Sequence, residues 1–236
     1  MQLLLLSNST RAGEAYFSFV NEHIFNFLDR NTNLLGCFIP YAGVTISYNE
    51  YYKTVKENLK ECNWQIESVH NTSNPAELVN KADFIMIGGG NTFHLLTELQ
   101  KNKLLDPIRE KVKKNIPYIG WSAGSNITCP TIGTTNDMPV ICPENFNALN
   151  LIPFQINPHY TNAAIPNLAG ETRDTRILEY IEVNTDMWVA GLPENCLFTF
   201  KNDTLKFKGE KTCRVFKYGQ KIADLNEADN FQFLMQ

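Results

Sequence analysis

Short apolar runs alternate along most of the chain with segments whose apolar residues recur at helical spacing. This alternation is typical of an α/β fold, in which helices cover a mostly parallel sheet on both faces. Phe17, Val20, Ile24 and Phe27, for example, follow the period of a helix. The predicted strands are residues 2–7, 34–40, 64–69, 84–87, 116–121, 151–156 and 188–192. The predicted helices are residues 13–30, 48–62, a short helix after Asn74, a helix through Leu95, Leu96 and Leu99, and residues 104–115 and 171–183.

Capping residues mark two of these helix starts. Ser47 and Glu50 form an S-x-x-E capping box, and Asn74 stands before Pro75 in the same kind of position. Residues 129–147 instead are rich in Thr, Gly, Pro and Asn, which predicts a long surface loop. Loops of this length inside compact domains are usually functional.

The C-terminal segment after Pro193 has a strand-like pattern. Its stretches LFTF, LKFKG and CRVFKYG alternate apolar and polar residues, which predicts edge strands or hairpins. The fold class expected is therefore α/β with a β-rich C-terminal tail. Because the chain contains no linker, repeat or low-complexity segment, residues 1–236 are expected to form one domain.

Composition and charge limit the kinds of molecule that the protein is expected to bind. The chain is 43% hydrophobic, and its 21 Lys and Arg against 25 Asp and Glu give a net charge of −4 without long runs of one sign. A nucleic-acid-binding protein usually has a basic patch or stripe, so a small-molecule partner is expected. No spacing of His and carboxylate residues suggests a metal site, and no cofactor is expected.

The cysteines and the N-terminus bear on location. The six cysteines include no C-x-x-C pair, which fits unpaired thiols in a reducing cytoplasm. The N-terminal apolar run is four leucines with no basic residue before it, too short for a signal peptide or a membrane span. It is expected to be a core strand, and no membrane association is expected.

The candidate chemistry centres on a G-x-S-x-G pentapeptide, Gly120 to Gly124, between a predicted strand and a helix. In this context small flanking residues permit a strained turn that exposes the hydroxyl of the central serine, here Ser122, as a nucleophile. The alternative is a serine that only caps the helix.

A second glycine-rich corner follows the strand at 84–87. The backbone N–H groups of Gly88 to Gly90, together with that of Ala123, are suited to hold a developing oxyanion. A dinucleotide loop would need glycine where Phe93 stands, and no G-K-[ST] follows, so neither phosphate motif is met.

A serine nucleophile needs a base and a carboxylate that orients it. Of the four histidines, His159 is the candidate base because it follows a predicted strand, where open parallel sheets place their ligand sites. His23, His70 and His94 fit structural or solvated positions better. Asp137, in the irregular loop, and Glu194, after the strand 188–192, are both plausible third members, and the sequence alone does not choose between them.

These segments resemble, in order, the motif series of peptidase E, the α-aspartyl dipeptidase family of serine peptidases. The matching motifs are IGGGNT (87–92), GWSAGSN (120–126), TTNDMP (134–139), NPHY (157–160), GETRDTRI (170–177) and GLPE (191–194). The resemblance implies a class I glutamine amidotransferase-like, flavodoxin-like fold. It also implies that Ser122 is the nucleophile, that His159 is the base, and that the N–H groups of Gly89 and Ala123 form the oxyanion hole. Asp137 and Glu194 both match acidic positions of the family.

The resemblance further implies hydrolysis of Asp-Xaa dipeptides through an aspartyl-enzyme. Arg173 matches the position expected to bind the carboxylate of the substrate's aspartate side chain, and Glu171 and Asn91 belong to the same expected substrate site. Ala169 and the residues before it depart from the His-rich run of the family. A small peptide substrate is the expected partner, with the protein a monomer or a homodimer.

Three alternative functions remain at this stage. An esterase of the α/β-hydrolase type also uses G-x-S-x-G, although its histidine usually lies near the chain end, whereas 77 residues follow His159. A cyanophycinase-like or isoaspartyl exopeptidase would act on β-linked aspartate. A non-catalytic binding module of the same fold would have no reactive serine.

Overall fold

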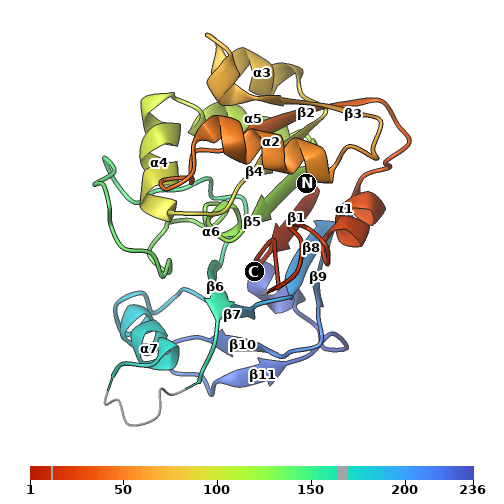
Figure 1. The fold of residues 1–236 in the computed structure, drawn as a ribbon. Helices are drawn as coiled ribbons and strands as arrows, with labels where there is room; N and C mark the ends of the chain where they lie inside the picture. Colours follow the sequence, from red (N-terminus) through yellow and green to blue (C-terminus); the bar gives the residue numbers. More distant parts are fainter. Residues whose placement is uncertain (12, 164–169) are drawn as a thin grey trace.

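The computed structural model describes residues 1–11, 13–163 and 170–236, which form two sheets with helices (Figure 1). Its strands are β1 (Leu3–Leu6), β2 (Leu34–Ile39), β3 (Trp64–Ser68), β4 (Phe84–Ile87), β5 (Tyr118–Trp121), β6 (Gln155–Tyr160), β7 (Val189–Pro193), β8 (Leu197–Lys201), β9 (Thr204–Lys208), β10 (Cys213–Phe216) and β11 (Ala223–Leu225). Its helices are α1 (Asn21–Phe27), α2 (Tyr48–Asn58), η1 (Val69–Asn71), α3 (Pro75–Lys81), α4 (Thr92–Lys101), α5 (Leu105–Lys113), α6 (Ala123–Asn126), α7 (Arg173–Val183) and η2 (Gln232–Met235).

The first sheet has seven strands in the order β3-β2-β4-β5-β1-β8-β9. The five strands from β3 to β1 pair in parallel, while the hairpin β8–β9 joins the edge at β1 in antiparallel fashion. Both faces are covered. Alternate residues of β1 show this, because Leu3 and Leu5 pack in one core cluster with helices α4 and α5, while Leu4 and Leu6 pack in another with α1 and α2. The predicted α/β fold is confirmed.

The second sheet has four strands in the order β11-β10-β7-β6, with β6 and β7 parallel. Helix α7 lies beside it, in the lower part of Figure 1 and away from the helices of the first sheet. Its buried residues Ile177 and Ile181 pack against Tyr160, Val189 and Phe216. The predicted β-rich tail is confirmed, and its strands are divided between the two sheets. The single-domain assignment stays a prediction.

Ser7, fully buried at the end of β1, links the two sheets. Its hydroxyl donates to the carbonyl of Leu192 in β7 over 2.9 Å, and it accepts the N–H of His159 in β6 over 2.8 Å. Because the two bonds reach neighbouring strands, they fix the second sheet against the carboxyl end of β1.

The two helix starts marked by capping residues were predicted correctly. The Ser47–Glu50 capping box is present in full, and the Asn74 side chain accepts the N–H of Glu77 at the start of α3. The predicted helix 13–30 was wrong in extent, because α1 spans only Asn21–Phe27. Phe17 has a φ of 65°, a left-handed conformation that a helix does not accommodate.

Two further predictions need correction. The strand predicted at 151–156 begins only at Gln155, because the N–H groups of Leu151 and Ile152 bond to the carbonyl of Thr128 instead of to a strand. The irregular segment 129–147 is a loop but not wholly on the surface, since Ile132 and Thr134 are buried in it. None of the helices in the described residues combines the length and the apolar character needed to cross a bilayer.

Candidate active site

Ser122 stands at the corner between β5 and α6 in a strained backbone conformation, with φ 53° and ψ −113°. A non-glycine residue in such a region is costly and occurs mostly at functional sites. The flanking glycines allow the sharp turn. A Cβ on Gly120 would lie 2.2 Å from the carbonyl oxygen of Gly124, and one on Gly124 would lie 2.1 Å from that of Ile87. The pentapeptide therefore forms the strand-turn-helix corner that its pattern predicted.

The imidazole of His159 lies between Ser122 and Glu194. Its Nε2 is 2.8 Å from the Ser122 Oγ, and its Nδ1 is 2.9 Å from the Glu194 Oε1. In the tautomer with hydrogen on Nδ1, the serine donates to Nε2 and the ring donates to the carboxylate. The His159 and Glu194 side chains are 38% and 52% exposed, so this pair is open to solvent.

His159 lies inside β6 and not after it, at a bulge where the pairing with β7 shifts register. Its φ is 53°, again left-handed. A bulge turns a side chain away from the regular alternation of a strand, and bulges recur beside active sites. The bulge, together with the bond from its N–H to Ser7, directs the imidazole to Ser122.

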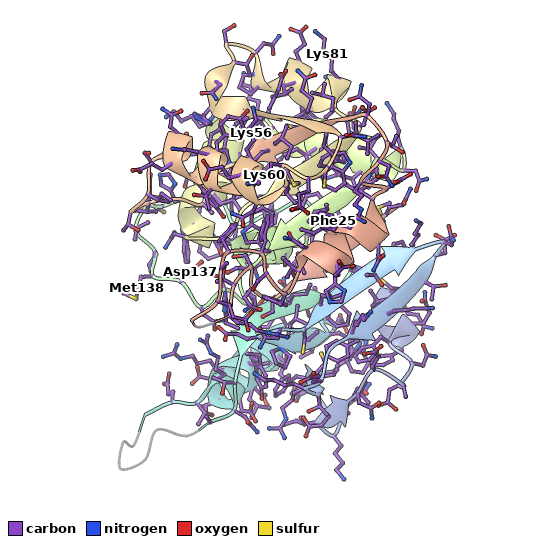
Figure 2. The ribbon with its side chains drawn as sticks, turned by 45° about the vertical axis from the view of Figure 1, so that its right-hand side comes forward. Phe25, Lys56, Lys60, Lys81, Asp137 and Met138 are labelled. Atoms are coloured by element: carbon purple, nitrogen blue, oxygen red, sulfur yellow. The ribbon has the colours of Figure 1, made fainter. Side chains whose placement is uncertain are left out.

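Asp137 makes no hydrogen bond to His159 among the described residues. Its Oδ2 accepts two hydrogen bonds from Thr92 at the start of α4, from the N–H (2.7 Å) and the hydroxyl (2.6 Å), and a third from the Thr135 hydroxyl in its own loop (3.0 Å). Figure 2 shows Asp137 and Met138 together at one edge of the molecule. Of the two acidic candidates, the structure brings Glu194 to the histidine and places Asp137 elsewhere in the cleft.

Backbone donors lie close to Ser122. Gly89 touches it, because a Cβ on Gly89 would be 3.0 Å from the Ser122 Cβ. The N–H groups of Gly89, Gly90 and Ala123 have no acceptor in the described part of the chain. Tyr51 steadies the glycine corner, because its hydroxyl donates to the Gly89 carbonyl (3.0 Å) and accepts the indole N–H of Trp121 (2.9 Å). Burial raises the pKa of Tyr51 well above its ordinary value, so this hydroxyl stays a donor.

Two hollows meet at His159. One, of about 750 Å³, is lined by Ser122, His159, Gly89, Asn91 and Asp137 together with apolar residues such as Val44, Ile46 and Val140. The other, of about 520 Å³, is lined by His159, Glu194, Lys211 and Asp224, among others. Only the first contains the serine, so it is the candidate substrate cleft.

The residues expected to bind substrate take different positions. Asn91 is the N-cap of α4: its Oδ1 accepts the N–H of His94 (3.0 Å) and its Nδ2 donates to the Met138 carbonyl (2.7 Å), while the residue also lines the cleft. Glu171 pairs with Arg176 over 3.5 Å at an exposed site. Ala169 and the residues before it, back to position 164, lie outside the described residues.

Arg173 begins α7 and is half-buried. Its Nη1 is buried and has no hydrogen-bond partner among the described residues. Burial and the nearby charge of Arg176 lower the pKa of its guanidinium, while the charge of Asp137 opposes that change. The next residue, Asp174, accepts hydrogen bonds from the Tyr160 hydroxyl and from Arg214 (2.7 Å), which fixes the start of the helix.

The other histidines make structural contacts or lie outside the cleft. The Nδ1 of His94 is 2.6 Å from the Tyr41 carbonyl, and the ring of His70 lies between Ser68 and Asn49. His23 lies in α1, where burial lowers its pKa. The described residues contain no group of three His, Cys, Asp or Glu arranged to hold a metal ion.

Sequence reasoning missed three residues that shape the site: Ser7, Asn8 and Tyr51. Ser7 holds the His159 backbone, and Asn8 accepts the N–H of Asn195 (2.8 Å), beside Glu194. The signal for the first two was a polar run directly after the first strand, at the carboxyl edge where parallel sheets bind ligands. Tyr51 gave no such signal, because it follows the ordinary spacing of a helix that packs on the sheet.

Comparison with known proteins agrees with this geometry. A model of peptidase family S51 matches residues 3–208. The chain is 45% identical over 235 residues to peptidase E of Nostoc sp. (strain PCC 7120 / SAG 25.82 / UTEX 2576), covering 100% of this chain and 97% of that protein. It is 42% identical over 231 residues to peptidase E of Salmonella typhimurium (strain LT2), covering 98% of this chain and 100% of the relative.

Solved structures agree in fold. A protein of Listeria monocytogenes EGD-e, provisionally named peptidase E, superposes with a TM-score of 0.64 at 25% identity, covering 88% of this chain and 97% of that one. A peptidase from an acI-B1 actinobacterium gives a TM-score of 0.62 at 16% identity, covering 98% of this chain and 96% of that one, and supports the fold alone. Because the family match spans most of the chain and both relatives align over nearly their whole length, this chain belongs to peptidase family S51 and is a serine peptidase.

Proposed function

We propose that this peptidase removes an N-terminal aspartate from short peptides, with Ser122 as nucleophile, His159 as base and Glu194 as the carboxylate that orients the base. The observation that carries the assignment is the continuous chain of hydrogen bonds from Ser122 through His159 to Glu194, at 2.8 and 2.9 Å. A nucleophile and base within hydrogen-bond reach, with the base held by a third group, define this type of catalysis.

In the first half of the reaction, the Ser122 Oγ attacks the carbonyl carbon of the Asp-Xaa bond while its proton passes to the His159 Nε2. The N–H groups of Gly89 and Ala123 hold the oxyanion that forms. When the intermediate collapses, the C–N bond breaks and the leaving amine takes the proton from Nε2. Glu194 stabilises the imidazolium that exists between the two transfers.

In the second half, water attacks the aspartyl ester and gives a proton to Nε2. The ester then breaks, Ser122 regains its proton, and free aspartate is released. Because the ring is partly exposed, water has access to the ester from the solvent side. Every proton is carried by the one imidazole, so the chemistry needs no group beyond the residues named.

Arg173 supports the preference for aspartate. Its buried, unpartnered Nη1 at the start of α7 is a cationic donor without an acceptor among the described residues. A planar guanidinium matches a carboxylate with two hydrogen bonds. A site built to satisfy a carboxylate rejects analogues that lack it, because its own buried donors are then left unpaired.

The six cysteines are all free, five of them buried, which fits an enzyme of a reducing compartment such as the cytoplasm. The alternative of an α/β-hydrolase esterase is disfavoured by the match to peptidase family S51. An exopeptidase for β-linked aspartate would use the same triad. Comparing the hydrolysis of α-linked and β-linked aspartyl peptides distinguishes it from the function proposed.

The test is hydrolysis of Asp-p-nitroanilide, Leu-p-nitroanilide and p-nitrophenyl acetate by the wild type and by Ser122→Ala, with a chelator present. We expect cleavage of the aspartyl anilide far above the leucyl anilide, and loss of that cleavage in the variant. Turnover of the acetate alone would indicate an esterase. Cleavage of β-linked but not α-linked aspartyl peptides would replace the substrate proposed. If a fluorophosphonate failed to label Ser122 and all substrates remained intact, the catalytic assignment itself would be wrong.

A further inference from the structure

Only one of the two oxygens of the Asp137 carboxylate accepts hydrogen bonds from the described residues. Its Oδ2 accepts three hydrogen bonds from Thr92 and Thr135, but its Oδ1 accepts none among the described residues. An ionised carboxylate offers acceptor sites on both oxygens, so one side of Asp137 is available to a ligand. The three bonds to Oδ2 fix the orientation of the group, because they come from two different segments.

The loop that carries Asp137 is also held firmly. The side chain of Asn136 donates to the carbonyl of Pro158 (2.7 Å), and that of Asn157 donates to the side chain of Asn136 (2.8 Å). Both partners lie in β6, directly before His159. The position of Asp137 relative to the base is therefore set before substrate arrives, and a preorganised group loses little entropy on binding.

Asp137 is the one acidic residue among the described residues that line the cleft containing Ser122. Apart from His159, which lies beside the serine, the other polar residues of the lining are Asn, Ser, Thr and Tyr. A cationic group of a substrate bound in this cleft has only Asp137 as a carboxylate partner. The fixed negative charge attracts such a group and repels an anionic one.

A cation stands near this carboxylate without pairing with it. Burial and the charge of Arg176 lower the pKa of the Arg173 guanidinium, and the negative charge of Asp137 opposes that change. The two residues form no ion pair, and the Arg173 Nη1 has no partner among the described residues. Opposite charges held close but apart suit a ligand that carries both. An N-terminal aspartate does, because its α-ammonium group and its β-carboxylate are separated by two carbons.

We propose that the Asp137 Oδ1 binds the α-ammonium group of the substrate's N-terminal residue, which makes Asp137 the residue that restricts the enzyme to free amino termini. The inference rests on the proposed function. An acylated or internal residue has an uncharged amide at this place, so it forms no ion pair with Asp137 and leaves the carboxylate facing a neutral group.

The experiment compares Asp-p-nitroanilide with succinyl-p-nitroanilide, which keeps the carboxylate and the scissile bond but has hydrogen in place of the ammonium group. We expect the wild type to prefer the aspartyl compound by roughly 100-fold in kcat/KM, as for truncation of a charged hydrogen-bonded pair. Asp137→Asn keeps an acceptor for Thr92 and removes the charge. It should lose roughly 100-fold on the aspartyl compound, mainly through KM, and leave the succinyl compound within about twofold.

Glu144→Gln is the matched control, since Glu144 lies in the same irregular segment and lines a different hollow, away from Ser122. It should leave both substrates unchanged. The rate at which a fluorophosphonate labels Ser122 is the second readout. It should be the same in Asp137→Asn as in the wild type, because the reagent has no ammonium group.

Equal wild-type rates on the two anilides would overturn the inference while leaving an aspartyl peptidase, and this comparison needs no variant to fold. Loss of labelling in a folded Asp137→Asn would also overturn it, because Asp137 would then act on the nucleophile. If the wild type labels but cleaves neither anilide, the proposed function fails and this inference fails with it.

Discussion

The nucleophile and the base of this enzyme are held by different means. Ser122 stands at a buried corner of the first sheet, where glycine backbones approach within distances that exclude any side chain. His159 and Glu194 come from the second sheet, are 38% and 52% exposed, and are positioned by hydrogen bonds. The nucleophile is thus fixed by steric exclusion, and the base by a few polar contacts.

We call the corner around Ser122 the nucleophile half of the site, and His159 with Glu194 the base half. The difference between them decides which substitutions each half tolerates. Steric constraints at a close-packed corner are not relieved by small shifts, because protein interiors pack at crystal density. Hydrogen bonds near solvent are replaced in part by water at modest cost. Substitutions on the nucleophile half should therefore act through folding or abolish the chemistry, whereas substitutions on the base half should reduce kcat by degrees.

The largest effect is expected for Ser122→Ala. Removal of the Oγ leaves no nucleophile, and by analogy with other serine peptidases kcat should fall by roughly 10⁶-fold. The corner itself should persist, because the glycine contacts remain. Asp-p-nitroanilide hydrolysis measures the loss, and an unchanged thermal denaturation midpoint would show that the fold is kept. Activity above a tenth of the wild type would contradict the assignment.

Glu194→Gln should come next, at about 10³-fold in kcat. The amide still accepts the Nδ1–H of His159 but no longer stabilises the imidazolium, and a buried carboxylate in this role is worth about 10⁴-fold. The 52% exposure of Glu194 lets water compensate in part. Steady-state kinetics measures the change. Near-normal kcat in Glu194→Gln, with loss of serine labelling in Asp137→Asn, would make Asp137 the third member.

Gly124→Ala tests the steric side of the comparison. Its Cβ would lie 2.1 Å from the carbonyl oxygen of Ile87, a backbone atom of the central sheet, so we expect a loss of about 3 kcal/mol or more in the free energy of unfolding. Gly191→Ala is the matched change on the base half. There the nearest contact, at 2.6 Å, is the ring of Tyr160, a side chain and not a backbone atom of the central sheet, so we expect a smaller loss.

Urea denaturation of both glycine variants measures the difference. A loss in Gly191→Ala as large as that in Gly124→Ala would show that the two halves are equally rigid. The comparison would then have to rest on the chemistry of the side chains alone.

The sequence predicted the nucleophile half well and the base half less well, for the same physical reason. Steric requirements leave a local pattern, G-x-S-x-G after an apolar run, and the strand, corner and helix all appeared where expected. The capping residues Ser47 and Asn74 were equally local signals. Assembly of the base half depends on residues far apart in the chain, such as His159 and Glu194, so local patterns left two acidic candidates.

The predicted strand at 151–156 failed for a related reason. Its first residues are apolar because they are buried, and burial alone does not distinguish a strand from a packed turn. The N–H groups of Leu151 and Ile152 bond to the carbonyl of Thr128, a tertiary contact that the hydrophobic periodicity of the sequence does not reveal. Likewise the helix predicted from residue 13 fails at Phe17, whose apolar side chain fits the helical pattern while its backbone does not.

The smallest effect is expected where the two halves meet. Ser7→Ala removes the hydroxyl that bonds to the Leu192 carbonyl (2.9 Å) and to the His159 N–H (2.8 Å), leaving two buried groups unpaired at a cost of about 2 kcal/mol. Because the imidazole position depends on that N–H, kcat should also fall by roughly 10-fold with KM unchanged.

Ser125→Ala is the matched change on the nucleophile half. The equally buried Ser125 hydroxyl lies within hydrogen-bond reach of the carbonyls of Leu6 (2.7 Å) and Gly120 (2.9 Å), and its one proton is shared between them. The substitution should cost similar stability but leave kcat within about twofold, because the corner is held by backbone contacts. Urea denaturation and steady-state kinetics on both variants separate the two quantities. Equal losses of kcat at equal losses of stability would mean that both halves are positioned by hydrogen bonds, and that the glycine contacts only permit the corner without holding it.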